Sequence, residues 1–165
     1  MIPIRFALAR MVLRLCRYLP DQRPPDFRIG DPARPILWRW WLLPRNRLCN
    51  IYFHMMLADD DDRALHDHPY WSLSLNLSRN VGEVYQRDPP HGAQRMRWFG
   101  LGQWVWRSPT FAHRLVLRPA SIGYTLFLTG PRIRDWGFWC ATGWRHHDDF
   151  AAVADATSTI GRGCD

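Results

Sequence analysis

The stretch HDHPYWSLSLNL, residues 66–77, decides the fold that the sequence predicts. Its second half alternates between polar residues (Tyr70, Ser72, Ser74 and Asn76) and apolar residues (Trp71, Leu73, Leu75 and Leu77). A period of two is typical of a β-strand whose side chains point to opposite faces. We therefore expect a polar face that lines a pocket and a leucine face that another element must cover. The N-terminal helix with Trp38, Trp40 and Trp41 can cover it; alternatively, a bulge near Pro69 reverses the register.

Short runs of this kind continue along the chain after Pro44. The predicted strands cover residues 51–58, 71–77, 83–86, 95–99, 103–106, 112–117, 123–128 and 135–140. Turn residues separate them and no helical pattern lies between them, which favours an antiparallel all-β sandwich or barrel over a parallel sheet.

The N-terminal part of the chain differs in character. Apolar residues recur at helical spacing from Phe6 to Leu19, which predicts one amphipathic helix that ends before Pro20. A basic helix of this type can lie on a membrane, but packing on the domain's own core is the favoured interpretation. The proline-rich residues 21–35 read as a connector. We therefore expect residues 1–45 to pack on a β-barrel of residues 46–150, followed by a flexible tail over residues 151–165.

Composition limits the class of protein. The 165 residues suit one domain, and 47% hydrophobic content excludes a disordered chain. No apolar run approaches the ~18 residues of a membrane-spanning helix. The net charge is +7, but all 22 basic residues are arginines scattered along the chain, which argues against nucleic-acid binding. The arginines interrupt any signal-peptide pattern, and the four cysteines are irregularly spaced, so we expect a cytoplasmic protein with reduced thiols.

Three histidines form the candidate site. On an extended segment His66 and His68 point to the same side, so both imidazoles can reach one metal ion, whereas a solvated turn is the alternative. His113 shares a strand face with Phe111, Leu115 and Leu117, which places it on an inward, apolar side. A core histidine with a hydrogen-bonded partner would also fit, but the pair on a neighbouring strand favours a third ligand.

These motifs resemble the cupins, whose first motif carries H-x-H and whose second carries a single His after a Gly…Pro stretch. His66-x-His68-Pro69 is similar to the first, and the segment from Gly102 through Pro109 to His113 is similar to the second. The resemblance spans roughly residues 51–140. It implies a cupin-type jelly-roll β-barrel with a metal at its inner end, held by His66, His68 and His113, and a protein that pairs into a homodimer.

The sequence departs from the family pattern at the fourth ligand. Ser72 and Leu73 stand where the family has Glu, and Asp60 and Phe111 stand where it has Gly. Glu83, on the strand after the next turn, is the natural replacement. A three-histidine site, as in some cupin-type dioxygenases, is the alternative, and pairing of Glu83 with an arginine is a third.

This ligand set predicts a divalent metal ion, with Fe(II) favoured and Zn(II), Mn(II) or Ni(II) as alternatives. The expected function is a metal dioxygenase acting on a small polar or anionic substrate, with Tyr85 or Tyr124 as the acid-base group and Arg97 or Arg114 as a carboxylate clamp. Two other classes stay open: a non-catalytic cupin that binds a ligand or metal, and an Arg/Trp-rich interaction protein that binds a membrane, nucleic acid or protein partner.

Other clusters carry weaker signals. The run Asp59-Asp60-Asp61-Asp62 reads as a solvated acidic turn, and His146-His147-Asp148-Asp149 reads as a terminal loop whose consecutive side chains diverge. His54 either lines the pocket or lies outside it.

Overall fold

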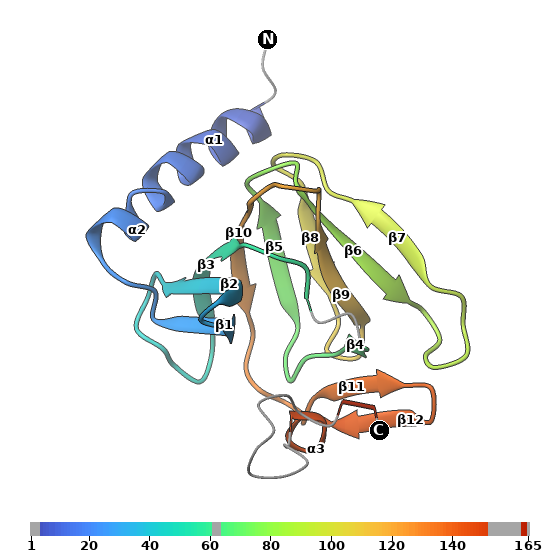
Figure 1. Ribbon diagram of the computed structural model, residues 1–165. Coiled ribbons are helices and arrows are strands. Elements are labelled where there is room, and N and C mark those ends of the chain that lie inside the picture. The colour runs from blue at the N-terminus through green and yellow to red at the C-terminus, as the bar shows by residue number, and fades with distance from the viewer. Residues whose placement is uncertain (1–3, 61–63, 152–162, 165) are drawn as a thin grey trace.

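Two six-stranded antiparallel sheets form the body of the protein (Figure 1). The computed structural model describes residues 4–60, 64–151 and 163–164, and the statements below concern these residues. Sheet 1 has the order β1 (Phe27–Asp31), β2 (Arg34–Trp41), β3 (Asn50–Met56), β10 (Gly123–Thr129), β5 (Ser72–Asn76) and β8 (Trp104–Arg107). Sheet 2 has the order β12 (Gly143–His146), β11 (Gly137–Cys140), β4 (Leu65–His66), β9 (Ala112–Leu117), β6 (Val81–Gln86) and β7 (Arg95–Trp98).

All eight strands expected from the sequence are present, and the all-β jelly-roll prediction is confirmed. They correspond to β3, β5, β6, β7, β8, β9, β10 and β11. The two short strands β4 and β12 were not predicted. Every strand pair is antiparallel, as the frequent turns and the lack of interleaved helices indicated.

The prediction of a connector over residues 21–35 was wrong. These residues contain β1 and the start of β2, which form a hairpin at the edge of sheet 1. Its register shifts between Ile29 and Gly30, and Gly30 has a φ of +98°, so the ladder is irregular near Pro35. Prolines are tolerated at an edge and beside a bulge because fewer backbone N–H groups must donate there, and this is why a proline-rich stretch can still be a hairpin.

The N-terminal helix is also shorter than predicted. Helix α1 (Ile4–Cys16) ends before a separate turn of helix, α2 (Leu19–Gln22), which contains Pro20 in its first turn. Proline suits the first turn because its missing N–H has no partner to lose there. Pro20 therefore starts a second helix instead of following the first.

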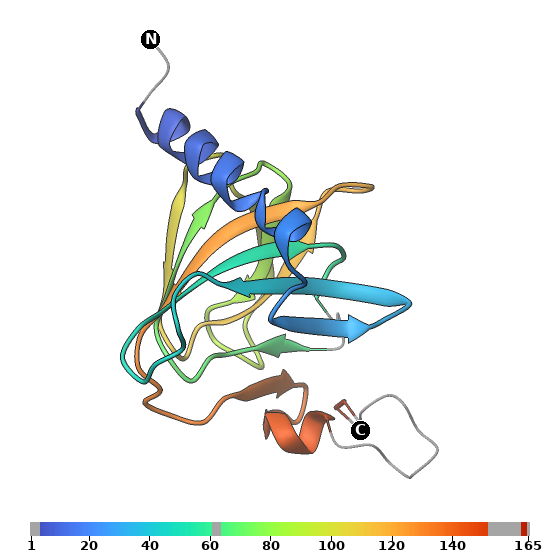
Figure 2. The ribbon, with the colours of Figure 1, turned by 90° about the vertical axis from the view of Figure 1, so that its left-hand side faces the viewer.

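The leucine face of β5 is covered by α1, as one of the two sequence alternatives predicted. Leu75 and Leu77 are buried in a cluster with Ala9 and Cys16 of α1 and with Trp40, which is completely buried. Figure 2 shows α1 running across the outside of the sheet. The opposite, polar face of β5 is thereby left to point between the two sheets.

The expectation of reduced cysteines was wrong for one pair. Cys140, at the end of β11, is bonded to Cys164, 24 residues further along the chain, whereas Cys16 and Cys49 are free. The spacing of the cysteines in the sequence did not indicate this bond. Strand β12 and helix α3 (His147–Ala151) lie between β11 and Cys164, and the two cysteines come together only in the fold. Most of the predicted flexible tail, residues 151–165, lies outside the described residues.

Candidate metal centre

A cavity of about 490 Å³ lies between the two sheets. Sheet 1 contributes residues of β1, β2, β3, β5 and β10 to its wall, and sheet 2 contributes residues of β4, β6 and β9. Its size is within the range of roughly 300–1,000 Å³ that is usual for small-molecule sites. His66, His68 and His113 all line this cavity.

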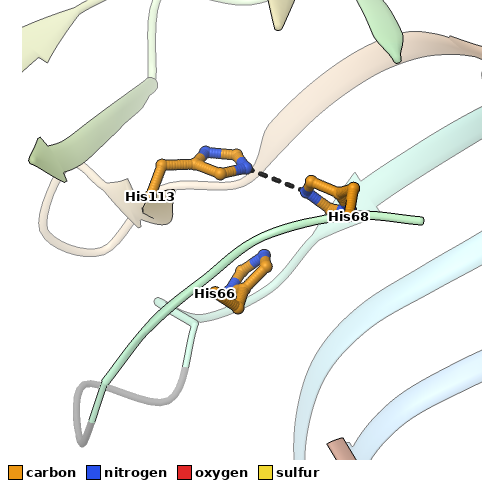
Figure 3. Close-up of side chains that lie close together, drawn as sticks. All are labelled: His66, His68 and His113. Atoms are coloured by element: carbon orange, nitrogen blue, oxygen red, sulfur yellow. Dashed lines mark hydrogen bonds between the residues drawn. The ribbon is translucent and has the colours of Figure 1, made fainter. Parts of the chain in front are cut away.

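The three predicted histidines converge (Figure 3). His66 of β4 is the register partner of His113 of β9, and His68 follows two residues later on the same extended segment. One ring nitrogen of each residue lies within 4.8 Å of those of the other two. The Nε2 atoms of His68 and His113 are 2.9 Å apart.

The side chain of Asp67 anchors the segment His66-Asp67-His68 on the side away from the cavity. This role was not predicted from the sequence. The carboxylate of Asp67 is completely buried and accepts hydrogen bonds from the backbone N–H of Gly137 at 2.8 Å and from Nε1 of Trp144 at 3.0 Å. Arg134 pairs with the same carboxylate at 3.0 Å. Because alternate residues of an extended chain point to opposite sides, anchoring Asp67 to the β11–β12 hairpin turns His66 and His68 toward the cavity.

The donor set fits a divalent transition-metal ion. The Nε2 atoms of His68 and His113 already lie 2.9 Å apart, and a ligand nitrogen of His66 lies within 4.8 Å of them, so all three imidazoles could hold one ion. Imidazole is a ligand for Zn, Cu, Fe and Ni, so ligand type alone does not select the metal.

Desolvation favours the neutral form of the three imidazoles, which is the form that binds a metal ion. Desolvation lowers the pKa of His66 and lowers the pKa of His68 well below its usual value, and the neighbouring imidazoles add to the effect on His68. Desolvation and the charge of Arg107 lower the pKa of His113 to about 3.

Glu83 lies behind His113 and is not one of the three residues whose ligand atoms cluster in the described chain. Its fully buried carboxylate lies 3.1 Å from Nδ1 of His113. Arg107 donates to Oε2 from Nε at 2.8 Å and from a terminal nitrogen at 2.6 Å, and Arg97 pairs with Oε1. Burial alone would raise the pKa of Glu83, but the hydrogen bond from His113 and the charge of Arg107 bring it down to about 2.

This contact assigns the tautomer of His113. An ionised carboxylate only accepts hydrogen bonds, so Nδ1 of His113 carries the proton and donates it to Glu83. Nε2 of His113 then has a free lone pair, and it faces His68. The geometry favours a three-histidine ligand set, with Glu83 supporting one ligand from behind in the way that carboxylates commonly support metal-bound histidines.

Three other residues proposed from the sequence are not among those that line the cavity, although one of them, Tyr85, is the register partner of His113. Tyr124 points to the outer core, where its ring stacks on Phe53. Arg114 neighbours His113 on β9, so its side chain points to the other side of the strand. Tyr85 stacks on Phe111 beneath the guanidinium of Arg97. Tyr124 and Arg114 are not among the residues that line the cavity, and the acid-base and clamp roles expected of them stay untested predictions.

Several polar residues that do border the cavity were missed or left open. Ser74 and Asn76 of β5 and Tyr70 confirm the polar face read from the sequence, and His54 lines the wall as well. Arg107 and Arg39 are the cationic lining residues, and neither was predicted. Arg107 shares the buried face of β8 with Val105, opposite the exposed Trp104 and Trp106, and β-sheet parity with Val105 could have indicated that it points inward.

The two weaker clusters also have defined structures. Asp59 and Asp60 accept hydrogen bonds from the backbone N–H groups of Leu117 and Leu115, each at 2.7 Å, so they pair with β9 instead of forming a free turn. Asp61 and Asp62 lie outside the described residues. His146, His147 and Asp148 do lie together, contrary to the expected divergence, since the junction of β12 and α3 brings their ligand atoms within 4.8 Å of one another.

Comparison with known proteins identifies the fold. The sequence matches no protein-family profile, and no curated protein is significantly similar to it. Among solved structures, FeII HppE matches with a TM-score of 0.53 and 12% identity over 67% of this chain and 58% of the other. A mutant of Bacillus subtilis oxalate decarboxylase OxdC matches with a TM-score of 0.52 and 12% identity over 83% of this chain and 33% of the other.

A third solved structure with a similar fold is a plant protein. The vicilin from Solanum melongena, described as holding different anionic ligands in structurally similar pockets, matches with a TM-score of 0.52 and 10% identity. The match covers 72% of this chain and 33% of the vicilin. In all three comparisons this chain spans less than two thirds of the other protein. The protein therefore has the cupin fold, and its function has to be argued from the site.

No helix in the described part of the chain combines the length and apolar character needed to cross a membrane.

Proposed function

We propose that the protein is a mononuclear metal enzyme that uses His66, His68 and His113 to hold Fe(II) for dioxygenase-type oxidation of a small polar or anionic substrate. The convergence of three neutral imidazoles on a cavity of substrate size carries the proposal. A ferrous ion held by three protein ligands would leave open positions for substrate and O2 and could activate O2 by electron donation, while the substrate would supply the electrons for its own oxidation.

The residues around the histidines prepare the site for this chemistry. Glu83 holds the His113 ring in one orientation and tautomer, and Arg107 neutralises the buried carboxylate. Arg107 also donates to the Ser74 hydroxyl at 3.0 Å, which links both sheets through one hydrogen-bonded network. Apolar lining residues such as Phe99, Leu115 and Phe127 exclude water from the space beside the histidines.

The comparisons support a metal but leave its use open. The likeness to FeII HppE supports iron only through the shared fold, because 12% identity carries no residue roles to this chain. The vicilin with anionic ligands supports the second candidate, a cupin that binds a ligand or metal without turnover. Homodimer formation, a cytoplasmic location and the absence of nucleic-acid binding stay predictions. The disulfide makes the location worth testing, since such bonds persist mainly in oxidising compartments.

The test uses protein prepared without a histidine tag, made metal-free and titrated anaerobically with Fe(II). The enzyme proposal predicts one ion per chain, followed by O2 consumption on an oxygen electrode with at least one member of a panel of small carboxylic acids. His66→Ala and His113→Ala abolish both signals, whereas His91→Ala, at an exposed position, changes neither. Stoichiometric metal with no O2 uptake would support the binding protein. No metal at all would refute the enzyme and a metal-binding role, and would leave only a protein that binds an organic ligand.

A further inference from the structure

Arg39 is the cationic residue of the cavity that the metal site does not use. It lies on the inner face of β2, opposite His54 of β3, and its Nε donates to Nε2 of His54 at 2.8 Å. Its guanidinium also stacks over the ring of Tyr52, with Cζ 4.8 Å from the ring centroid. These contacts hold the side chain in place through Nε and the guanidinium face, and the two terminal nitrogens make no hydrogen bond among the residues that the structure describes.

The charge of Arg39 has no counterion among the residues that the structure describes. Arg107, the other cationic lining residue, is neutralised by Glu83, whereas no carboxylate pairs with Arg39. Burial lowers the pKa of Arg39, but a guanidinium stays protonated in a protein. A partly buried cation without a partner is costly, and a ligand that brings a carboxylate removes this cost while matching the planar fork of donors.

The wall around Arg39 is apolar. Phe27 and Ile29 of β1 and Ile36 and Leu37 of β2 line the same cavity. Phe27 is 49% exposed and Ile29 is 39% exposed, so the hairpin presents apolar surface that a ligand would cover. Tyr70 lies on the lining too, and its ring stacks on that of His68 at 5.8 Å. One cavity therefore joins this cation, an apolar wall, the three histidines and Asp60, whose carboxylate is hydrogen-bonded to the backbone N–H of Leu115 and does not pair with Arg39.

We propose that the ligand of this cavity is a small monocarboxylate with an apolar body, whose carboxylate binds Arg39 and whose body packs on the β1–β2 hairpin. This deepens the proposed function, on which the role of the acid as a substrate rests. Binding of the acid itself depends on Arg39 and the hairpin, and it can be measured apart from metal and turnover.

The probes are butanoate, hexanoate and octanoate, each compared with its primary amide, in isothermal titrations of the metal-free and the Fe(II)-loaded protein. At least one acid is expected to bind about 10- to 100-fold more tightly than its amide, the range for hydrogen bonds to charged groups. Arg39→Gln loses this preference and keeps one metal per chain. Arg28→Gln, on the exposed face of β1, changes neither.

The outcomes separate the two proposals. If no acid binds, if acid and amide bind equally, or if Arg39→Gln binds as wild type does, the carboxylate inference is overturned even when the metal is present. If an acid binds through Arg39 but no metal does, the carboxylate inference stands and the metal enzyme falls. A folded Arg39→Gln variant is verified by its unchanged metal content or, failing metal, by its circular dichroism spectrum.

A second inference rests on α1, which has two apolar faces. One packs on the outer core through Ala9 and Cys16. The second apolar face is exposed, and its residues are separated in turn by four, three, four and three positions. They are Ile4 (87% exposed), Leu8 (42%), Met11 (54%), Leu15 (69%) and, just beyond the helix, Tyr18 (66%). Figure 2 shows the helix on the outside of the protein.

The positive charges beside this exposed apolar face indicate what kind of partner binds it. Exposed arginines at positions 5, 10, 14 and 17 flank it, and the sequence of α1 contains no acidic residue. A second copy of the helix would bring arginine rows together, which is repulsive. An anionic lipid surface complements the arginines and accepts the apolar side chains at its acyl boundary, the arrangement of basic amphipathic helices that lie in the membrane plane.

We infer that α1 docks the protein on an anionic membrane surface without crossing it. The test is co-sedimentation with vesicles of phosphatidylcholine containing about 30% phosphatidylglycerol, against vesicles of phosphatidylcholine alone. Binding is expected to be at least about tenfold tighter on the anionic vesicles. Met11→Glu/Leu15→Glu abolishes binding, whereas Ile133→Glu, at a position 65% exposed beyond β10, does not. Equal binding to both vesicles, no binding, or a dimer in light scattering that the double variant dissolves would each overturn the inference.

Discussion

Nδ1 of His113 lies 3.1 Å from Oε2 of Glu83, while Nε2 of the same ring faces His68. One side of the imidazole is therefore held by a buried carboxylate, and the other side is left with a lone pair toward the cavity. The tautomer of the proposed ligand follows from this single contact.

Glu83→Gln tests the contact. The amide keeps the shape but removes the charge, so His113 is held less firmly and metal affinity is expected to fall about 10- to 100-fold. Arg107, only 3% exposed, also loses its counterion, which costs about 3–5 kcal/mol of stability. Chelator competition and urea unfolding measure the two effects. Arg97→Gln is the control, because its guanidinium is 42% exposed and the pair contributes about 1 kcal/mol or less.

Acid is expected to destabilise the metal-free protein from about pH 6.5 downward. Burial lowers the pKa of His113 from its ordinary value of 6.5 to about 3. Between these two pH values the unfolded chain binds a proton at His113 and the folded chain does not. The contribution of neutral His113 to the free energy of unfolding is therefore fully present above pH 6.5 and is lost as the pH falls toward 3. Glu83 acts in the same direction between pH 4.5 and about 2, because its pKa is also lowered.

Urea midpoints measured at several pH values between about 7.5 and 4 check this dependence. His113→Gln should give a shallower pH slope than wild type, and His91→Gln, at an exposed position, should leave the slope unchanged. A wild-type midpoint that does not move between about pH 7 and pH 5 would contradict the burial of neutral imidazoles.

Gly102→Ala is expected to loosen α1. Gly102 has a φ of +72°, and a Cβ there would lie 2.7 Å from the backbone oxygen of Arg5. The substitution therefore combines a left-handed backbone with a clash, and a loss of about 1–3 kcal/mol is expected. Hydrogen exchange should show the loss of protection in α1. Gly143→Ala, at a φ of +124° in open space, should leave α1 protected; equal loss of protection in both variants would contradict the close approach.

The disulfide is expected to stabilise the C-terminal segment. Joining Cys140 to Cys164 closes a loop of 24 residues, for which the chain-entropy estimate is about 3 kcal/mol. A reductant should lower the thermal midpoint of wild type and leave that of Cys140→Ser/Cys164→Ser unchanged. A wild-type midpoint insensitive to complete reduction would show that the bond contributes nothing to stability.

The sequence predicted the elements that depend on local pattern. The alternation in residues 71–77 identified both the strand and its faces, and the same parity placed His113 inside. It misjudged residues 21–35 because proline content suggests a connector, whereas a hairpin at a sheet edge accepts prolines.

What the sequence could not supply was pairing between distant segments. Arg107 and Glu83 are 24 residues apart, and nothing local indicates that they neutralise each other. Arg39 stands among tryptophans in a stretch where only the register with His54 shows that it points into the cavity. Tyr124 and Arg114 were proposed from residue type alone, and strand parity beside His113 would already have placed Arg114 on the face away from the cavity.

The most direct test of the account is the metal content of tag-free protein after loading with Fe(II) and gel filtration without oxygen. Wild type is expected to retain one ion per chain, and His66→Ala, His68→Ala and His113→Ala are each expected to retain almost none while remaining folded. Wild type that retains no metal, or variants that retain it fully, would contradict a centre built from these three imidazoles.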